Sequence, residues 1–223
     1  MDWMLATGGG MATRSLAREA HRRLIGMIFE GVLKPGDALQ EAAVGEALGM
    51  SRTPVREAIK RMESEGLTIT EGRMTRVRRL RSSEVEEIFF LRLELEPFAA
   101  RSAIHLPSSQ VDAMEARVRA LMAAGPKVDD AQWQIDNDLH NLLARAAGNG
   151  TIATTIESLH RRTCVFDYSQ VPGRFLAGCE EHLTILGAVR AGDSDAVEAN
   201  MRRHLEHARD AVLERLRHLP GQP

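Results

Sequence analysis

Four polar residues interrupt apolar helical faces in the second half of the chain. Asp136 and His140 are one helical turn apart, and His182 and His204 each lie among apolar residues of their own segment. A buried carboxylate is costly unless it is paired or binds a metal. One carboxylate and three imidazoles suit a divalent transition metal such as Zn²⁺, Ni²⁺ or Mn²⁺, which we predict here. The alternative is that each histidine is a hydrogen-bonded core residue.

Arg92 also interrupts an apolar face, and Glu96 follows it one helical turn later. Two interpretations are open for this pair. The two side chains neutralise each other in the core, or the planar guanidinium of Arg92 binds the carboxylate of a small effector. We predict the second role and place Arg92 and Glu96 at an effector site.

A third candidate site is the polar face of the helix expected between Ser51 and Gly66. Ser51 is a candidate N-cap, Pro54 fits the first turn, and Gly66 fits a left-handed C-terminal cap. One face of this helix is apolar, whereas the opposite face carries Thr53, Arg56 and Lys60. This basic face either is simply solvated or contacts an anionic partner.

The elements around this helix favour the anionic partner. Helices expected at 14–31 and 40–48 precede it, and a three-residue turn joins it to the second of them, which is a helix-turn-helix arrangement. The β-branched segments 67–70 and 74–78 flank Gly72 and predict a basic hairpin, the wing of a winged helix. We predict DNA contacts from the polar face of the helix at Thr53, Arg56 and Lys60, and from the basic hairpin at Arg73.

The charge distribution agrees with this division. Residues 14–81 contain 14 lysines and arginines against 9 acidic residues, whereas residues 82–223 contain 15 against 21. The basic part alone therefore suits a nucleic acid. Two cysteines indicate a reducing compartment, and no long apolar run or signal peptide is evident, so we expect a cytoplasmic protein that does not contact a membrane.

The expected fold class is mainly α. We predict a disordered tail at 1–13, a winged helix-turn-helix domain at 14–79 (three helices and a hairpin) and a linker at 80–82. An all-helical bundle at 83–218 and a short tail at 219–223 complete the chain. Ser83 and Glu86 are expected to form a capping box at the start of the bundle.

Several strings resemble the DNA-binding domain of GntR-family transcriptional regulators. They are Pro-Gly-Asp-Ala-Leu-Gln-Glu at 35–41, Ser-Arg-Thr-Pro-Val-Arg-Glu-Ala at 51–58 and Glu-Gly-Leu at 65–67. The resemblance implies that Arg52, Thr53 and Arg56 contact operator DNA and that Gly72 is the wing tip. Ala42 departs from the family, whose members often carry arginine there, so one DNA contact is expected to be missing.

The second half resembles the FCD effector domain of the FadR-like branch of that family. Asp136-x3-His140, Ala-Ala-Gly-Asn at 146–149, Glu181-His182 and Met-Arg-Arg-His-Leu at 201–205 carry the resemblance. It implies that the four matching positions bind a metal, and the Arg-x-x-x-Glu spacing from Arg92 resembles the start of that domain.

These observations predict a homodimeric transcriptional regulator and not an enzyme. It would bind a pseudo-palindromic operator and respond to a small organic acid held near the metal. A metal-dependent hydrolase is one rival, but no glutamate is placed as a general base beside a ligand histidine. A DNA-binding protein with a purely structural metal is the other rival.

Overall fold

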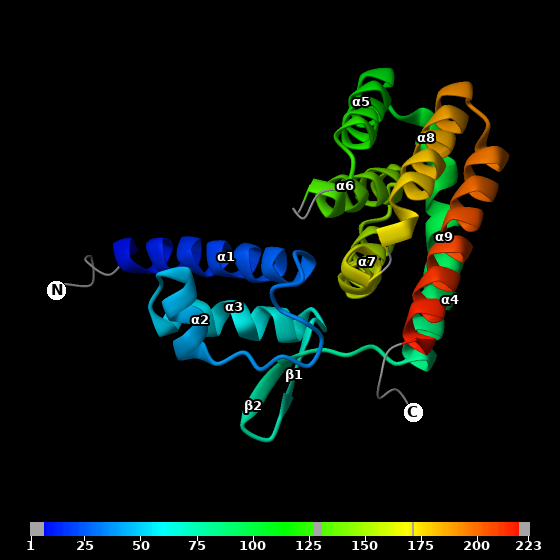
Figure 1. Cartoon of the computed structure of the whole chain (residues 1–223). Coiled ribbons are helices and arrows are strands. Elements are labelled where there is room, and N and C mark those ends of the chain that lie inside the picture. Colours follow the sequence, from blue (N-terminus) through cyan, green and yellow to red (C-terminus); the bar gives the residue numbers. More distant parts are fainter. Residues whose placement is uncertain (1–6, 127–130, 171, 219–223) are drawn as a thin grey trace. The chain divides into compact units, whose positions relative to one another are not determined.

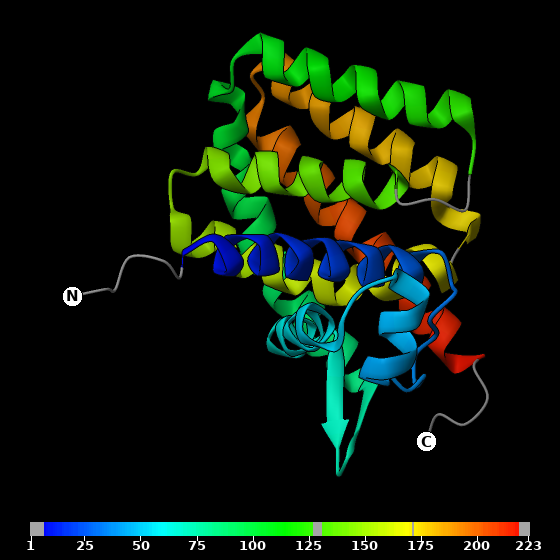
Figure 2. The ribbon, with the colours of Figure 1, turned by 90° about the vertical axis from the view of Figure 1, so that its left-hand side faces the viewer.

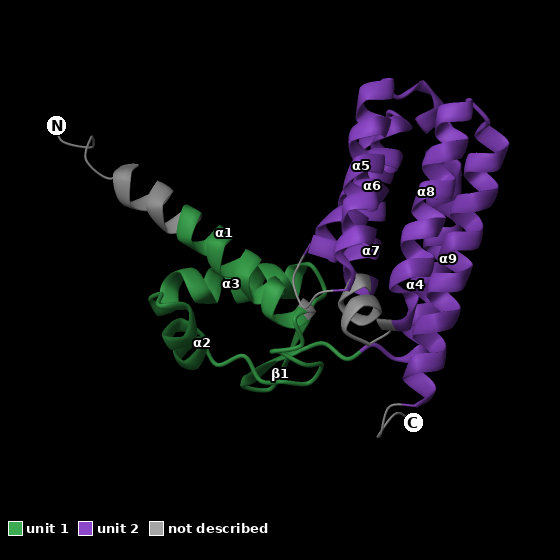
Figure 3. Cartoon of the chain, turned by 45° about the horizontal axis from the view of Figure 1, so that its top comes forward, with its two compact units in different colours: residues 1–79 green, residues 80–223 purple. Residues whose placement is uncertain are grey.

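The computed structural model describes residues 7–126, 131–170 and 172–218. It divides into two compact units, residues 1–79 and residues 80–223 (Figure 3). The first unit consists of helices and a two-stranded sheet, and the second is helical throughout its described part (Figure 1). The predicted fold class, a winged helix-turn-helix joined to an all-α domain, is confirmed.

The first unit contains α1 (Thr7–Phe29), α2 (Glu41–Leu48) and α3 (Arg52–Ser64), followed by β1 (Thr68–Glu71) and β2 (Met74–Val77). Helix α1 begins at Thr7, so the predicted disordered tail is wrong for residues 7–13, and residues 1–6 lie outside the described part. The strands are antiparallel, with Thr68 opposite Val77. Gly72 has a positive φ of 64° in the two-residue turn, which favours glycine at the wing tip.

The periodicity of α3 explains its packing. Its apolar face is buried against α1 and α2, and its basic face stays exposed. Gly66 has a φ of 74°, as expected of a left-handed cap. The predicted cap from the Ser51 hydroxyl is wrong, because Ser51 occupies the N-cap position without a side-chain hydrogen bond. Arg52 and Thr53 at the start of the helix are exposed, so water can satisfy their N–H groups instead.

The second unit is a bundle of six α-helices with two 3₁₀ turns in its described part. The elements are α4 (Ser82–Ala100), η1 (Arg101–His105), α5 (Ser108–Ala124), α6 (Ala131–Ala146), α7 (Gly150–Gln170), η2 (Pro172–Arg174), α8 (Phe175–Ala191) and α9 (Ser194–Arg217). The predicted capping box of Ser83 and Glu86 is wrong. Helix α4 begins one residue earlier, with Arg81 at the N-cap and no side-chain cap.

The helices of this unit enclose one main apolar core. Helix α9 runs beside α4, α6 packs against α7, and α8 packs against α5 and α9 (Figures 1 and 2). Phe89, Leu139, Ile185 and Leu205 are among the fully buried side chains. The polar side chains of interest project into this bundle from α4, α6, α7, α8 and α9. Among the described residues, no helix is long and apolar enough to cross a membrane.

Candidate functional site

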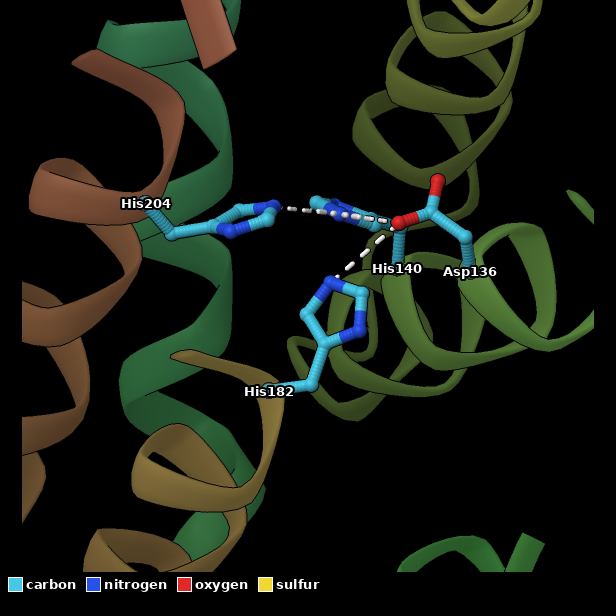
Figure 4. Close-up of side chains that lie close together, drawn as sticks. All are labelled: Asp136, His140, His182 and His204. Carbon is cyan, nitrogen blue, oxygen red and sulfur yellow. Dashed lines mark hydrogen bonds and ion pairs between the residues drawn. The ribbon is translucent and has the colours of Figure 1, made fainter. Parts of the chain in front are cut away.

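The four predicted metal ligands meet in the middle of the second unit. Asp136 and His140 project from α6, His182 from α8 and His204 from α9, toward a common point (Figure 4). All four are buried, and each offers a ligand atom that lies within 4.8 Å of the others. The bundle therefore brings together residues that are up to 68 positions apart in the chain.

Hydrogen bonds to carboxylates set the tautomers of two of these histidines. His140 Nδ1 donates to Glu96 Oε2, and His204 Nδ1 donates to Glu181 Oε2 at 2.8 Å. An ionised carboxylate only accepts hydrogen bonds, so each Nδ1 carries a proton and each Nε2 points away from its carboxylate. The two Nε2 atoms face each other at 3.2 Å. Where neither Nε2 carries a proton, two lone pairs face each other, and a bound cation would accept both.

His182 adds a third buried nitrogen, which pairs with Asp136 but meets no hydrogen-bond criterion. Its Nε2 is buried and forms no hydrogen bond within the described residues, although Asp136 Oδ1 lies 3.2 Å away. An unsatisfied buried acceptor or donor costs about 1–3 kcal/mol, so such an atom requires an explanation. The other oxygen of Asp136 accepts a hydrogen bond from His160 Nε2 at 2.7 Å. Asp136 Oδ1 is thereby left facing the three ligand histidines.

The ionisation states suit a metal. Burial raises the pKa of Asp136, but His160 and His140 outweigh burial and hold that pKa well below its ordinary value. Burial also lowers the pKa of His204 to about 3, so its imidazole is neutral at pH 7. An ionised carboxylate and neutral imidazoles are the forms that bind divalent cations. The donor set, the facing Nε2 atoms and the nitrogen of His182 beside Asp136 together fit Zn²⁺, Ni²⁺ or Mn²⁺.

Arg92 and Glu96 lie behind His140. Both are buried, Arg92 Nε donates to Glu96 Oε1 at 2.5 Å, and Arg92 Nη1 donates to Thr163 Oγ1 at 2.8 Å. Neither residue lines the cavity beside the metal ligands. The geometry therefore favours the alternative left open by the sequence, a buried ion pair. A direct contact between Arg92 and an effector stays a prediction that this geometry does not support.

The sequence analysis missed the residues that support the ligands. His160 holds Asp136, and Glu181, which the sequence offered only as part of the Glu181-His182 string, holds His204. Glu181 also accepts hydrogen bonds from His207 Nδ1 at 2.7 Å and from Arg174 Nη2 at 2.6 Å. Burial raises the pKa of Glu181, but the hydrogen bonds from His204 and His207 lower it to about 2. No periodicity marks these contacts, because they join different helices.

A small cavity adjoins the ligands. Its volume is about 30 Å³, and Asp136, His182 and His204 form part of its wall. Arg174 from η2 is also in the wall, and Phe175 at the start of α8 belongs to the apolar part. This volume holds one or two species of the size of water.

In the first unit, the predicted DNA contacts lie on accessible surfaces. The predicted residues on α3 are all exposed, namely Arg52, Thr53, Arg56 and Lys60. The two residues of the wing turn, Gly72 and Arg73, are exposed as well. Ala42 is exposed on α2. Thus the structure keeps the basic face of α3 free of the core, as a recognition helix requires.

Comparison with known proteins agrees with both units. Residues 13–77 match the model of bacterial regulatory proteins of the gntR family, and residues 87–207 match the model of the FCD domain. The chain is 29% identical over 208 residues to the HTH-type transcriptional repressor RspR of Escherichia coli strain K12, covering 90% of both chains. It is 31% identical over 213 residues to an HTH-type transcriptional regulator in an unstable DNA locus of Streptomyces ambofaciens, covering 92% of this chain and 87% of the relative.

The fold is similar to the crystal structure of a GntR transcriptional regulator from Rhodococcus sp. RHA1. The TM-score is 0.74 at 21% identity, and the similarity covers 90% of this chain and 98% of the other. The matched families and relatives are regulators and not enzymes. This chain therefore belongs to the GntR family of bacterial transcriptional regulators and carries an FCD domain.

Proposed function

We propose that this regulator binds operator DNA through α3 and the wing, and that a divalent metal and a small organic acid in the second unit control the binding. The DNA part follows from the family and from the exposed basic face of α3. Arg52, Thr53 and Arg56 are assigned to the major groove, whereas Arg73 at the wing suits phosphates or the minor groove.

The observation that carries the metal part is the facing pair of imidazole nitrogens. Glu96 and Glu181 hold the Nε2 atoms of His140 and His204 toward each other, 3.2 Å apart. A bound divalent cation would accept both lone pairs and also the nitrogen of His182. It would supply a positive charge at the cavity, which is suited to a carboxylate ligand.

We also propose a homodimer in which α4 pairs with α4 of a second copy. Phe90 and Phe98 lie on one face of α4 with exposed fractions of 65% and 60%, and Leu91 lies beside them. Large aromatic side chains exposed together on one helix commonly mark an interface. A symmetric dimer would supply two copies of α3, one for each half of a pseudo-palindromic operator.

The metal part is tested by metal analysis of His182→Ala and of the wild type after each is loaded with Zn²⁺ and desalted. We expect one zinc per wild-type chain and a substantial loss in His182→Ala, together with a lower melting temperature, because a metal that binds the folded state stabilises it. His218→Ala, which changes an exposed histidine, is the matched control. Equal zinc content in all three proteins would remove His182 from the site.

The regulatory part is tested by measuring operator affinity with and without a carboxylate effector. An effector that changes the affinity only in the metal-loaded protein supports the proposal. The rival, a purely structural metal, predicts that metal removal unfolds the second unit and that no carboxylate changes operator affinity. Sedimentation of Phe90→Glu beside the wild type tests the dimer, since a charge on this face should produce monomers.

A further inference from the structure

The cavity beside the metal ligands has one cationic wall residue that the proposed metal does not use. Arg174 comes from the 3₁₀ turn η2, just before α8, and its side chain is only 16% exposed. The ligands Asp136, His182 and His204 lie in the same wall. The remaining wall includes the apolar side chains of Leu121, Ile135 and Phe175 and the polar side chain of Gln132.

Arg174 has hydrogen-bonding capacity to spare. A guanidinium has five N–H donors in a fork that matches a carboxylate. Within the described residues, Arg174 uses Nη2 alone, which donates to Glu181 Oε2 at 2.6 Å. An arginine at the wall of a small cavity, with most of its donors unused, provides a ready charge-assisted contact for an anion.

We propose that Arg174 anchors the carboxylate of the effector, the role that the sequence analysis gave to Arg92. This inference rests on the proposed function, and it narrows the ligand class to short aliphatic monocarboxylates. Their carboxylate would face Arg174, and their hydrocarbon end would contact the apolar wall. The cavity of about 30 Å³ must widen to admit an acid, and the shortest members require the least widening.

The same contacts connect the effector to the metal ligands. Glu181 Oε2 accepts from both Arg174 and His204 Nδ1, so one oxygen joins the proposed anchor to a proposed ligand. A carboxylate bound to Arg174 would change the charge around Glu181 and hence the strength of the hydrogen bond that His204 donates to Glu181. Because linkage is reciprocal, zinc should then alter acetate affinity by the same factor as acetate alters zinc affinity.

The test is calorimetric titration of the zinc-loaded full chain with acetate, propionate and butyrate, with the corresponding amides as uncharged analogues. Arg174→Gln removes the charge, and Arg174→Lys keeps the charge without the fork. Arg162→Gln is the matched control, since Arg162 is a half-buried arginine that donates to Glu84 at 2.8 Å and does not line the cavity. Zinc content and melting temperature are recorded for every variant.

We expect the wild type and Arg162→Gln to bind at least one acid and no amide. Arg174→Gln should lose about tenfold or more in affinity while it keeps its zinc, and Arg174→Lys should fall between the two. Acid binding by Arg174→Gln at wild-type strength would overturn the anchor and leave the proposed function standing. Equal losses in Arg174→Gln and Arg162→Gln would also overturn it. A wild type that binds zinc and DNA but none of the three acids would refute the monocarboxylate class and the anchor, and would leave the broader organic-acid proposal to its own operator-affinity test.

Discussion

Arg92→Met tests whether Arg92 is a structural ion-pair residue or an effector contact. In the structure Arg92 is 3% exposed and donates to Glu96 and Thr163, and its guanidinium lies 4.9 Å from the centre of the Phe89 ring. Methionine fills a similar volume and keeps most of the apolar packing. The substitution therefore removes chiefly the charge and its hydrogen bonds.

The expected loss of stability follows from the carboxylate of Glu96, which stays buried without Arg92. Breaking a buried ion pair by removing one partner costs about 3–5 kcal/mol, because the other charge stays buried. Glu96 keeps the hydrogen bond from His140, which places the expected loss near the lower end, at about 3 kcal/mol. For a unit of this size, a loss of that order lowers the melting temperature by about 6–12 °C.

The assay is thermal and urea unfolding of the full chain, with operator affinity measured beside it. Arg119→Met is the control, because Arg119 also forms a pair four residues apart, with Glu115, but is 63% exposed. That exposed pair should contribute less than about 0.5 kcal/mol. The double variant Arg92→Met with Glu96→Gln should lose less free energy of unfolding than the two single variants lose together, since no unpaired carboxylate remains.

Two results would contradict this reasoning. If Arg92→Met unfolds like the wild type and responds normally to effectors, Arg92 has neither role. If it is as stable as the wild type but no longer responds, the effector role predicted from the sequence is restored, and the anchor assigned to Arg174 is weakened.

Three further substitutions test the other contacts. Arg56→Ala should cost about 1–3 kcal/mol of discrimination for operator over random DNA, measured by fluorescence anisotropy, and equal losses on both DNAs would make Arg56 a phosphate contact. Gly45→Ala should destabilise the first unit by about 1–3 kcal/mol in urea unfolding, because a Cβ there would lie 2.8 Å from the carbonyl oxygen of Met50; a fully stable variant would refute this. Glu181→Gln should weaken zinc binding about 10–100-fold in a competition titration, because His204 loses its carboxylate acceptor, and an unchanged affinity would remove that role.

The parts of the fold that the sequence predicted are those governed by local rules. The apolar positions of α3 repeat with the helical period, and Gly72 between β-branched segments predicts the wing hairpin. The inward direction of Asp136, His140, His182 and His204 also follows from periodicity, because each interrupts an apolar face. The capping predictions at Ser51 and Ser83 failed, since exposed helix ends have water available and need no hydroxyl.

The contacts that support the site could not be predicted in this way. Glu96 reaches His140 across 44 positions, and Glu181 reaches His204 across 23 positions. Such pairs depend on how whole helices pack, which a single sequence does not specify. His160 could not be singled out from the sequence for the same reason, because its partner Asp136 is on a different helix.

Arg92 and Arg174 illustrate this limit of prediction from the sequence. Two of the ligand histidines are held by a carboxylate that in turn accepts from an arginine, which gives the two chains of contacts Arg92–Glu96–His140 and Arg174–Glu181–His204. The first chain is enclosed in the core, where its charges must satisfy one another. The second begins at the cavity wall, where a ligand can replace one of the partners. Sequence periodicity reveals only Arg92, because it lies on a long helix four residues before its partner, whereas Arg174 lies in a three-residue 3₁₀ turn that has no pattern of its own. Burial, and not chemistry, therefore distinguishes the arginine that holds the ligands from the one assigned to sense the effector.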